Sequence, residues 1–131
     1  MNQILEFLKK NPTYFLATVD ANGNPQVRPF GTIAEFEGSL YIQTGRSKAV
    51  YEQIKAHPRV AISGMGGDGS WIRIECTLVE DARLEAETAV MDEYPSLQGM
   101  YQPGDGNCCV LRMEDISACI DSFTAPRVVI E

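Results

Sequence analysis

The feature that most constrains the fold is a run of short strand-like segments joined mostly by tight turns. Strict alternation of apolar and polar residues over 71–80, "WIRIECTLVE", predicts a long, half-buried strand. The turns at 21–24 and 37–38 are short enough to join only antiparallel neighbours, since parallel strands need a long crossover. The other predicted strands are 14–20, 25–36, 39–44, 59–64, 108–113 and 117–123.

Three helices are predicted to flank this sheet, at 2–11, at 48–57 and from Asp81 to about Tyr94. The first two have one apolar face each, which suits packing against a sheet. An antiparallel sheet in so short a chain usually closes into a small barrel, because closure removes exposed edges. We therefore expect a mainly β fold with flanking helices, built as a six- to seven-stranded antiparallel barrel.

Length and charge limit the classes of function. The 131 residues suffice for one core, so we expect residues 1–131 to form a single domain. The net charge of −7 argues against a nucleic-acid partner and against binding to an anionic membrane surface, since both need a broad basic face. The sequence has no long apolar run and no secretory-signal pattern near its start, so a cytoplasmic protein is expected.

Few residues are candidates for metal binding or nucleophilic catalysis. The four cysteines form no C-x-x-C motif and are expected to be reduced, mostly buried thiols. His57 is the single histidine and ends a predicted helix, so there is no pattern for a metal site or for a Ser-His-Asp or Cys-His pair. No catalytic residue and no metal ligand is therefore predicted.

A local cationic cluster stands out in this acidic chain. Arg46, Ser47 and Lys48 lie where a strand ends and the second helix begins. The first amides of a helix have no intrahelical acceptor and carry partial positive charge, so they favour a phosphate. Together with a guanidinium and an ammonium group they predict a monophosphate site. The alternative is that Ser47 only caps the helix while the two cations are solvated.

The stretch "VRPFGTIAEFEGSLYIQTGRSKAVYEQIKAHPRVAIS" resembles the flavin-binding half of the pyridoxamine 5′-phosphate oxidase-like split-barrel family. In that family an arginine begins the second barrel strand, a threonine ends the third, and an Arg/Ser/Lys cluster opens the next helix. The segments "WIRIECTLVEDA" and "IDSFTAPRVVIE" are similar to later strands, so the resemblance covers nearly the whole chain. It implies an FMN-binding split barrel and a homodimer with FMN at the subunit interface.

The resemblance also implies which residues contact FMN. Trp71 matches a position where the partner subunit reaches the flavin, although an ordinary barrel or interface aromatic is an equal alternative. Arg73, on the same strand face, would either approach the partner's flavin or form a salt bridge with Glu75 or Glu35. The remaining residues would meet the flavin ring, the ribityl chain and the 5′-phosphate in turn: Arg28, Pro29, Phe30, Gly31, Gln43, Thr44, Arg46, Ser47 and Lys48.

The activity that the resemblance implies is an FMN-dependent oxidoreductase that passes electrons from NAD(P)H to a small acceptor. The acceptor is left open among a nitro compound, a quinone, a flavin and oxygen. The alternatives are a non-catalytic flavin-binding or electron-storage module, a relative that binds F420 or haem, and an apo barrel whose Arg-Ser-Lys cluster binds another phosphate. Short members of the family include general-stress and Nim-type flavoproteins. Nim-type members place a histidine on the strand matching "YIQT", where this chain has Gln43.

Overall fold

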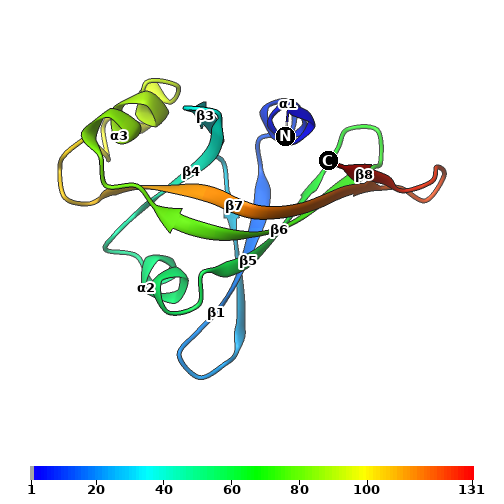
Figure 1. Cartoon of the computed structure of the whole chain (residues 1–131), viewed down its shortest axis with the longest axis horizontal. Coiled ribbons are helices and arrows are strands. Elements are labelled where there is room, and N and C mark those ends of the chain that lie inside the picture. Colours follow the sequence, from blue (N-terminus) through cyan, green and yellow to red (C-terminus); the bar gives the residue numbers. More distant parts are fainter. Residues whose placement is uncertain (1) are drawn as a thin grey trace.

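A computed structural model describes residues 2–131 of the chain, which form one antiparallel eight-stranded sheet flanked by helices (Figure 1). The predicted mainly β, antiparallel split-barrel architecture is confirmed, with eight strands where six or seven were expected. The strands are β1 (Tyr14–Val19), β2 (Pro25–Phe30), β3 (Ala34–Phe36), β4 (Ser39–Gly45), β5 (Arg59–Met65), β6 (Trp71–Glu80), β7 (Cys108–Asp121) and β8 (Val128–Ile130). The helices are α1 (Asn2–Lys10), α2 (Ala49–Ala56), α3 (Leu84–Met91) and the short 3-10 helix η1 (Pro95–Leu97).

The order of the strands explains why the barrel is split. They run β2-β1-β5-β6-β7-β4-β3, with β8 added beside β7. β2 and β3 are therefore at opposite ends of the sheet, although only residues 31–33 separate them along the chain. We call residues 31–33 the connector. At this point the described chain closes the barrel covalently, and no backbone ladder joins β2 to β3.

The alternating pattern of β6 shows how the sequence builds the core. Ile72, Ile74 and Leu78 point into the barrel and are almost completely buried, whereas Arg73 and Glu75 point outward. Burying one large aliphatic side chain stabilises the fold by about 1.5–3 kcal/mol. The apolar faces of α1 and α2 complete the same core through Ile4, Leu8, Val50, Tyr51 and Ile54.

The prediction of one strand over 25–36 is wrong, because the connector interrupts it. Side chains replace the missing ladder bonds there. The Tyr14 hydroxyl donates to the carbonyl of Thr32 at 2.6 Å. The Tyr94 hydroxyl accepts from the amide of Ile33 at 2.7 Å and donates to its carbonyl at 2.9 Å. The connector is therefore held in one conformation by two tyrosines, the buried Tyr14 and the half-buried Tyr94.

The prediction of two strands over 108–123 is also wrong, because β7 is one strand of 14 residues. Asp115 takes a positive φ of 49°, and the register against β6 shifts between Glu75 and Thr77. The expected turn is thus a bulge, in which an extra residue is absorbed while the pairing continues on both sides. The bulge lets β7 pair with β6 along its length and with β4 and β8 near its two ends.

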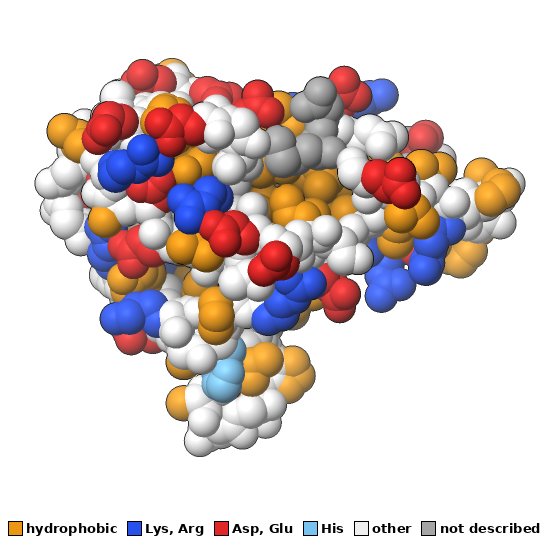
Figure 2. Space-filling model, in the orientation of Figure 1, with side chains coloured by type: hydrophobic (Ala, Val, Ile, Leu, Met, Phe, Trp, Pro, Cys, Tyr) orange, Lys and Arg blue, Asp and Glu red, His pale blue; other side chains and the backbone are white. Residues whose placement is uncertain are grey.

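The predicted helices are all present, and each is shorter than expected. α3 begins at Leu84 with Arg83 as its N-cap residue, where Asp81 was expected to be the cap; the Asp81 carboxylate accepts a hydrogen bond from the amide of Arg83 at 3.2 Å. α3 packs on β3, β4 and β7, and α2 packs on β1 (Figure 1). No helix within residues 2–131 is both long and apolar enough to span a membrane. Figure 2 shows acidic and basic side chains interspersed over one face of the molecule.

Candidate functional site

A pocket of about 330 Å³ lies where the barrel is split. One side is formed by the end of β2, the connector, the end of β4 and the start of α2. The other side is the segment between Tyr94 and Tyr101, which contains η1. We call this the split pocket. Six of the residues predicted to bind a cofactor line it together: Pro29, Phe30, Gly31, Gln43, Thr44 and Lys48.

Thr44 carries the clearest sign that the split pocket is built for a ligand. Its side chain is 3% exposed, and its hydroxyl has no hydrogen-bond partner among residues 2–131. Leaving a buried polar group unpaired costs about 1–3 kcal/mol, so such groups are rare without a purpose. The neighbouring Gln43 is satisfied, since its side-chain amide donates to the carbonyl of Thr44 at 2.9 Å. A hydroxyl-rich ligand in the pocket would supply the partner that Thr44 lacks.

The start of α2, next to Thr44, also has polar groups without hydrogen-bond partners. Lys48 is the N-cap residue and makes no side-chain cap, and the Ser47 hydroxyl is exposed with no partner among the described residues. The alternative in which Ser47 caps the helix is therefore wrong. The amides of Ala49 and Val50 have no acceptor in the described chain. The Lys48 ammonium forms no ion pair within residues 2–131 and lies 5.9 Å from the centre of the Tyr101 ring. These groups suit a phosphate.

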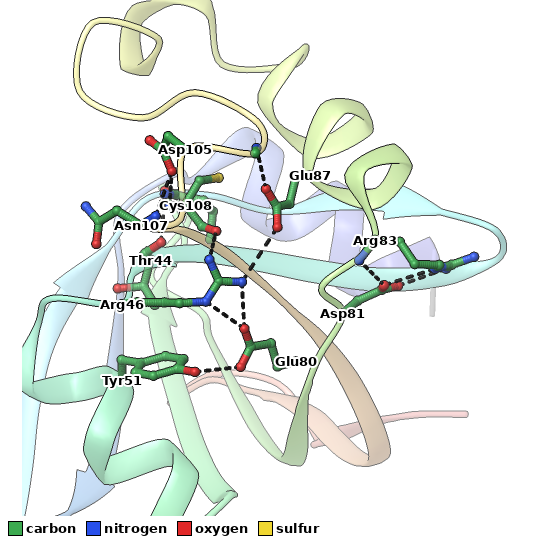
Figure 3. Close-up of polar contacts among 12 residues, drawn as sticks. Thr44, Arg46, Tyr51, Glu80, Asp81, Arg83, Glu87, Asp105, Asn107 and Cys108 are labelled. Carbon is green, nitrogen blue, oxygen red and sulfur yellow. Dashed lines mark hydrogen bonds and ion pairs between the residues drawn. The ribbon is translucent and has the colours of Figure 1, made fainter.

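Arg46 belongs to the same predicted cluster, but its guanidinium turns into the protein (Figure 3). Its Nε donates to Glu80 at 2.8 Å, and its Nη1 donates to the carbonyl of Cys108 at 2.7 Å. Its Nη2 is 2.6 Å from Glu80 and 3.6 Å from Glu87. Tyr51 of α2 donates to the second oxygen of Glu80 at 2.7 Å. We call Arg46, Tyr51, Glu80 and Glu87 the Arg46 cluster.

Within the Arg46 cluster, the surroundings favour the charged forms of Arg46 and Glu80. Burial disfavours the Arg46 cation, but the hydrogen bond and charge of Glu80 outweigh this and raise the pKa of Arg46. Burial likewise opposes ionisation of Glu80, and the hydrogen bonds from Tyr51 and Arg46 prevail and lower the pKa of Glu80. Next to this cluster, hydrogen bonds from Arg83 lead the causes that hold the pKa of Asp81 well below its usual range.

Arg28 and Trp71, two further predicted contacts, lie away from the split pocket. The Arg28 guanidinium lies between β1 and α2 and donates to the carbonyl of Leu16, the hydroxyl of Thr18 and the side chain of Gln53 at 3.1, 2.7 and 2.8 Å. Burial lowers its pKa. Trp71 packs against an exposed phenylalanine, Phe123, with ring centres 5.0 Å apart. Whether Trp71 meets a partner's flavin stays a prediction.

The sequence reasoning missed the second wall of the split pocket. Tyr101 packs so tightly against Gly45 that a Cβ on Gly45 would come within 2.9 Å of the ring. No local pattern pairs two residues so far apart in the chain. The long loop between α3 and β7 was the available signal, because long irregular loops often carry function. The residues of this wall are Tyr94, Ser96, Leu97, Met100 and Tyr101.

A second hollow, of about 490 Å³, lies on the outer surface of the sheet. Phe15 and Val27 form an apolar edge, and Arg73 and Arg127 supply charge. For Arg73, the alternative of a salt bridge with Glu75 or Glu35 is wrong, since its ion pair is with Asp121 at 3.9 Å, and an approach to a partner's flavin stays a prediction. We call this surface, made by β1, β2 and β5 to β8, the outer face. Within residues 2–131 no group of three or more His, Cys, Asp or Glu side chains is arranged to hold a metal ion.

Comparisons with known proteins agree with the split-barrel fold described above. A family model described as pyridoxamine 5′-phosphate oxidase matches residues 1–114. A solved NimC/NimA family protein from Clostridium acetobutylicum is 37% identical with a TM-score of 0.94, and the match covers 99% of this chain and 90% of that one. This likeness to a Nim-type protein exists although Gln43 stands where such proteins were expected to have histidine.

Two more distant structures show the same fold. A pyridoxamine 5′-phosphate oxidase-related, FMN-binding protein from Nostoc punctiforme is 17% identical with a TM-score of 0.65, covering 99% of this chain and 96% of that one. An F420 reductase is 21% identical with a TM-score of 0.62, covering 86% of this chain and 94% of that one. No curated protein matched the chain.

Proposed function

Because the chain belongs to the pyridoxamine 5′-phosphate oxidase family, we propose that its split pocket binds FMN and that the protein passes electrons from NAD(P)H to a small acceptor. The observation that carries this proposal is the unpaired, buried hydroxyl of Thr44 beside an uncapped helix start. A sugar-alcohol chain ending in a phosphate has the two chemistries that these neighbouring groups lack. The FMN-binding relative supports the choice of cofactor.

The phosphate would be held at the start of α2. Lys48 provides a cation with no competing carboxylate, and Ser47 provides a hydroxyl donor. The free amides of Ala49 and Val50 add two hydrogen bonds and the positive end of the helix dipole. Charge-assisted hydrogen bonds of this kind contribute about 1.5–3 kcal/mol each. Thr44 would accept or donate a hydrogen bond to the polyol that follows the phosphate.

The ring would lie along the apolar part of the split pocket. Pro29 and Phe30 end β2 there, and the connector after them is held rigid by Tyr14 and Tyr94. A rigid wall orients a planar ligand without the entropy cost of ordering a loop. A bound flavin would supply the redox chemistry itself, since it accepts hydride and releases electrons singly or in pairs. The protein then needs only to bind, orient and expose the ring.

The outer face supports a homodimer. The side chains of Phe15, Val27 and Val129 are 48%, 66% and 64% exposed, which is unusual for three large apolar residues on one sheet face. Backbone register aligns Phe15, Ser63, Arg73, Cys119 and Val129 in one row across five strands. A second copy laid on this row would cover the apolar groups and bring Trp71 and Arg73 toward its partner.

The purified protein provides the test. An absorption spectrum with the bands of oxidised flavin, bleached by NADH or NADPH without oxygen and restored repeatedly by air or a quinone, supports the FMN oxidoreductase. A flavin spectrum that neither nicotinamide changes supports the flavin-binding or electron-storage module instead. A deazaflavin spectrum would favour F420, in keeping with the F420 reductase that shares the fold. A protein that binds no flavin even when FMN is added in excess contradicts the proposal.

A further inference from the structure

The Arg46 guanidinium directs all three of its nitrogens to acceptors within the protein, although the Arg-Ser-Lys sequence points to a ligand. Guanidinium has five N–H donors on three nitrogens. Each nitrogen of Arg46 has a protein acceptor within 2.6–2.8 Å: Glu80 for Nε and Nη2, and the carbonyl of Cys108 for Nη1. Figure 3 shows the side chain directed away from the start of α2 and into this group of acceptors.

These bonds connect the first wall of the split pocket with the loop that follows Tyr101, the last residue of the second wall. Glu80 also accepts from Tyr51 of α2, and Glu87 also accepts from the amide of Gly104 at 2.8 Å. The backbone repeats the connection, since the amide of Arg46 donates to the carbonyl of Asn107 at 2.8 Å and that of Ser47 donates to the Asn107 side chain at 2.9 Å. The turn before α2 and the loop after Tyr101 are thus joined around a single arginine.

Turning Arg46 toward a phosphate would undo this arrangement. Glu87 is 4% exposed, and its carboxylate would lose Arg46, its cationic partner. Glu80 would lose two hydrogen bonds at the same time. Removing one partner of a buried ion pair is strongly unfavourable, because the remaining charge stays desolvated. Two carboxylates without their shared cationic partner would also repel a dianion bound nearby.

We propose that Arg46 is a positioning residue that does not touch the phosphate. It holds the turn at 45–47 and the Tyr101 wall in place, so that Lys48, Ser47 and the first amides of α2 meet the ligand. This inference rests on the proposed binding of FMN. It assigns different tasks to the two cations of one short motif: Lys48 recognises the phosphate, and Arg46 shapes the pocket for the whole cofactor.

The test compares FMN with riboflavin, which lacks only the phosphate. Dissociation constants are measured for both flavins with wild type, Lys48→Ala, Arg46→Lys and Glu80→Gln. Lys48→Ala should weaken FMN binding roughly tenfold or more and leave riboflavin nearly unchanged. Arg46→Lys and Glu80→Gln should weaken both flavins by a common factor and keep the FMN-to-riboflavin ratio of wild type. The salt dependence of FMN binding should flatten only in Lys48→Ala.

A direct phosphate contact by Arg46 predicts the opposite pattern. Arg46→Lys would then change the ratio and the salt dependence as Lys48→Ala does, and Glu80→Gln would strengthen FMN selectively by freeing the guanidinium. Either result overturns this inference alone. Wild type that binds neither flavin overturns the proposed function as well. Asp81→Asn is the matched control, because it removes a neighbouring buried charge that is outside the split pocket. It should lower stability and leave both dissociation constants unchanged.

Discussion

Two polar regions adjoin the turn at 45–47, and they differ in how far their hydrogen bonds are satisfied. In the Arg46 cluster and around Asp81, charged side chains have partners at 2.6–3.0 Å. On the pocket side, the side chains of Thr44, Ser47 and Lys48 form no hydrogen bond within residues 2–131. The first region stabilises the fold, whereas the second leaves its polar side chains available to a ligand. Satisfaction of polar groups, more than residue type, separates the structural residues here from those proposed to bind the ligand.

Acid is expected to disturb the satisfied region most. The folded pKa values of Glu80 and Asp81 are lowered, so these carboxylates stabilise the protein above their unfolded pKa of about 4. That contribution is lost as pH falls from about 4 through the lower folded values. Urea unfolding of wild type between pH 7 and pH 3 should show the loss. The double variant Glu80→Gln/Asp81→Asn should be less stable at pH 7 and lose less on acidification. An equally steep loss in the variant would contradict the assignment.

Gly45 lies between the two regions, and enlarging it should harm both. Gly45→Ala places a Cβ 2.9 Å from the Tyr101 ring and 3.3 Å from the side-chain nitrogen (Nδ2) of Asn107. Overpacking of this kind costs about 1–3 kcal/mol. We expect a lower free energy of unfolding and weaker FMN binding, because Tyr101 must leave the pocket wall. Adding Tyr101→Leu should recover stability and leave binding impaired. Full FMN affinity in Gly45→Ala would show that the wall does not matter.

The finest distinction is between two threonines that are equally buried. Thr18 is 2% exposed, and its hydroxyl donates to Gln53 at 2.6 Å and accepts from Arg28 at 2.7 Å. Thr44 is 3% exposed and unpaired. Thr18→Val should therefore destabilise the protein by about 1 kcal/mol or more.

Thr44→Val should instead raise the free energy of unfolding of the ligand-free protein, because it removes an unsatisfied hydroxyl and keeps the shape of the side chain. The gain in stability should be on the order of 1 kcal/mol. FMN binding should be weaker, because the hydroxyl that meets the ligand is gone. Thermal unfolding of both variants with and without FMN is the measurement. Destabilisation of the ligand-free Thr44→Val protein would show that its hydroxyl already has a partner.

Much of the fold was predictable because local patterns determine it. The alternation over β6 and the turn residues near Gly23 and Gly38, both at positive φ, mark strands and hairpins directly. The bulge at Asp115 was not predictable, since polar residues in mid-strand indicate a turn equally well. The break after β2 depends on Tyr94, which lies far along the chain and replaces ladder bonds with its hydroxyl.

The site was predictable in part for the same reason. The resemblance brought Pro29–Gly31, Gln43, Thr44 and Lys48 together as lining residues, and the structure gathers them in one pocket. It could not tell Arg46 from Lys48. The orientation of Arg46 depends on Glu80 and Glu87, which join this turn only after β6 and α3 have formed. Long-range partners of a charged side chain leave no mark in the short motif.

The strand order has a consequence for synthesis. The hairpins β1–β2 and β3–β4 are both complete by Gly45, yet β1 needs β5 and β4 needs β7 as second neighbours. Isolated two-stranded hairpins are marginally stable in water. A ribosome therefore releases the two flanks of this barrel well before the central strands that join them. Stable folding must wait until most of β7 has emerged, and until then the nascent chain exposes apolar surface of the kind that chaperones bind.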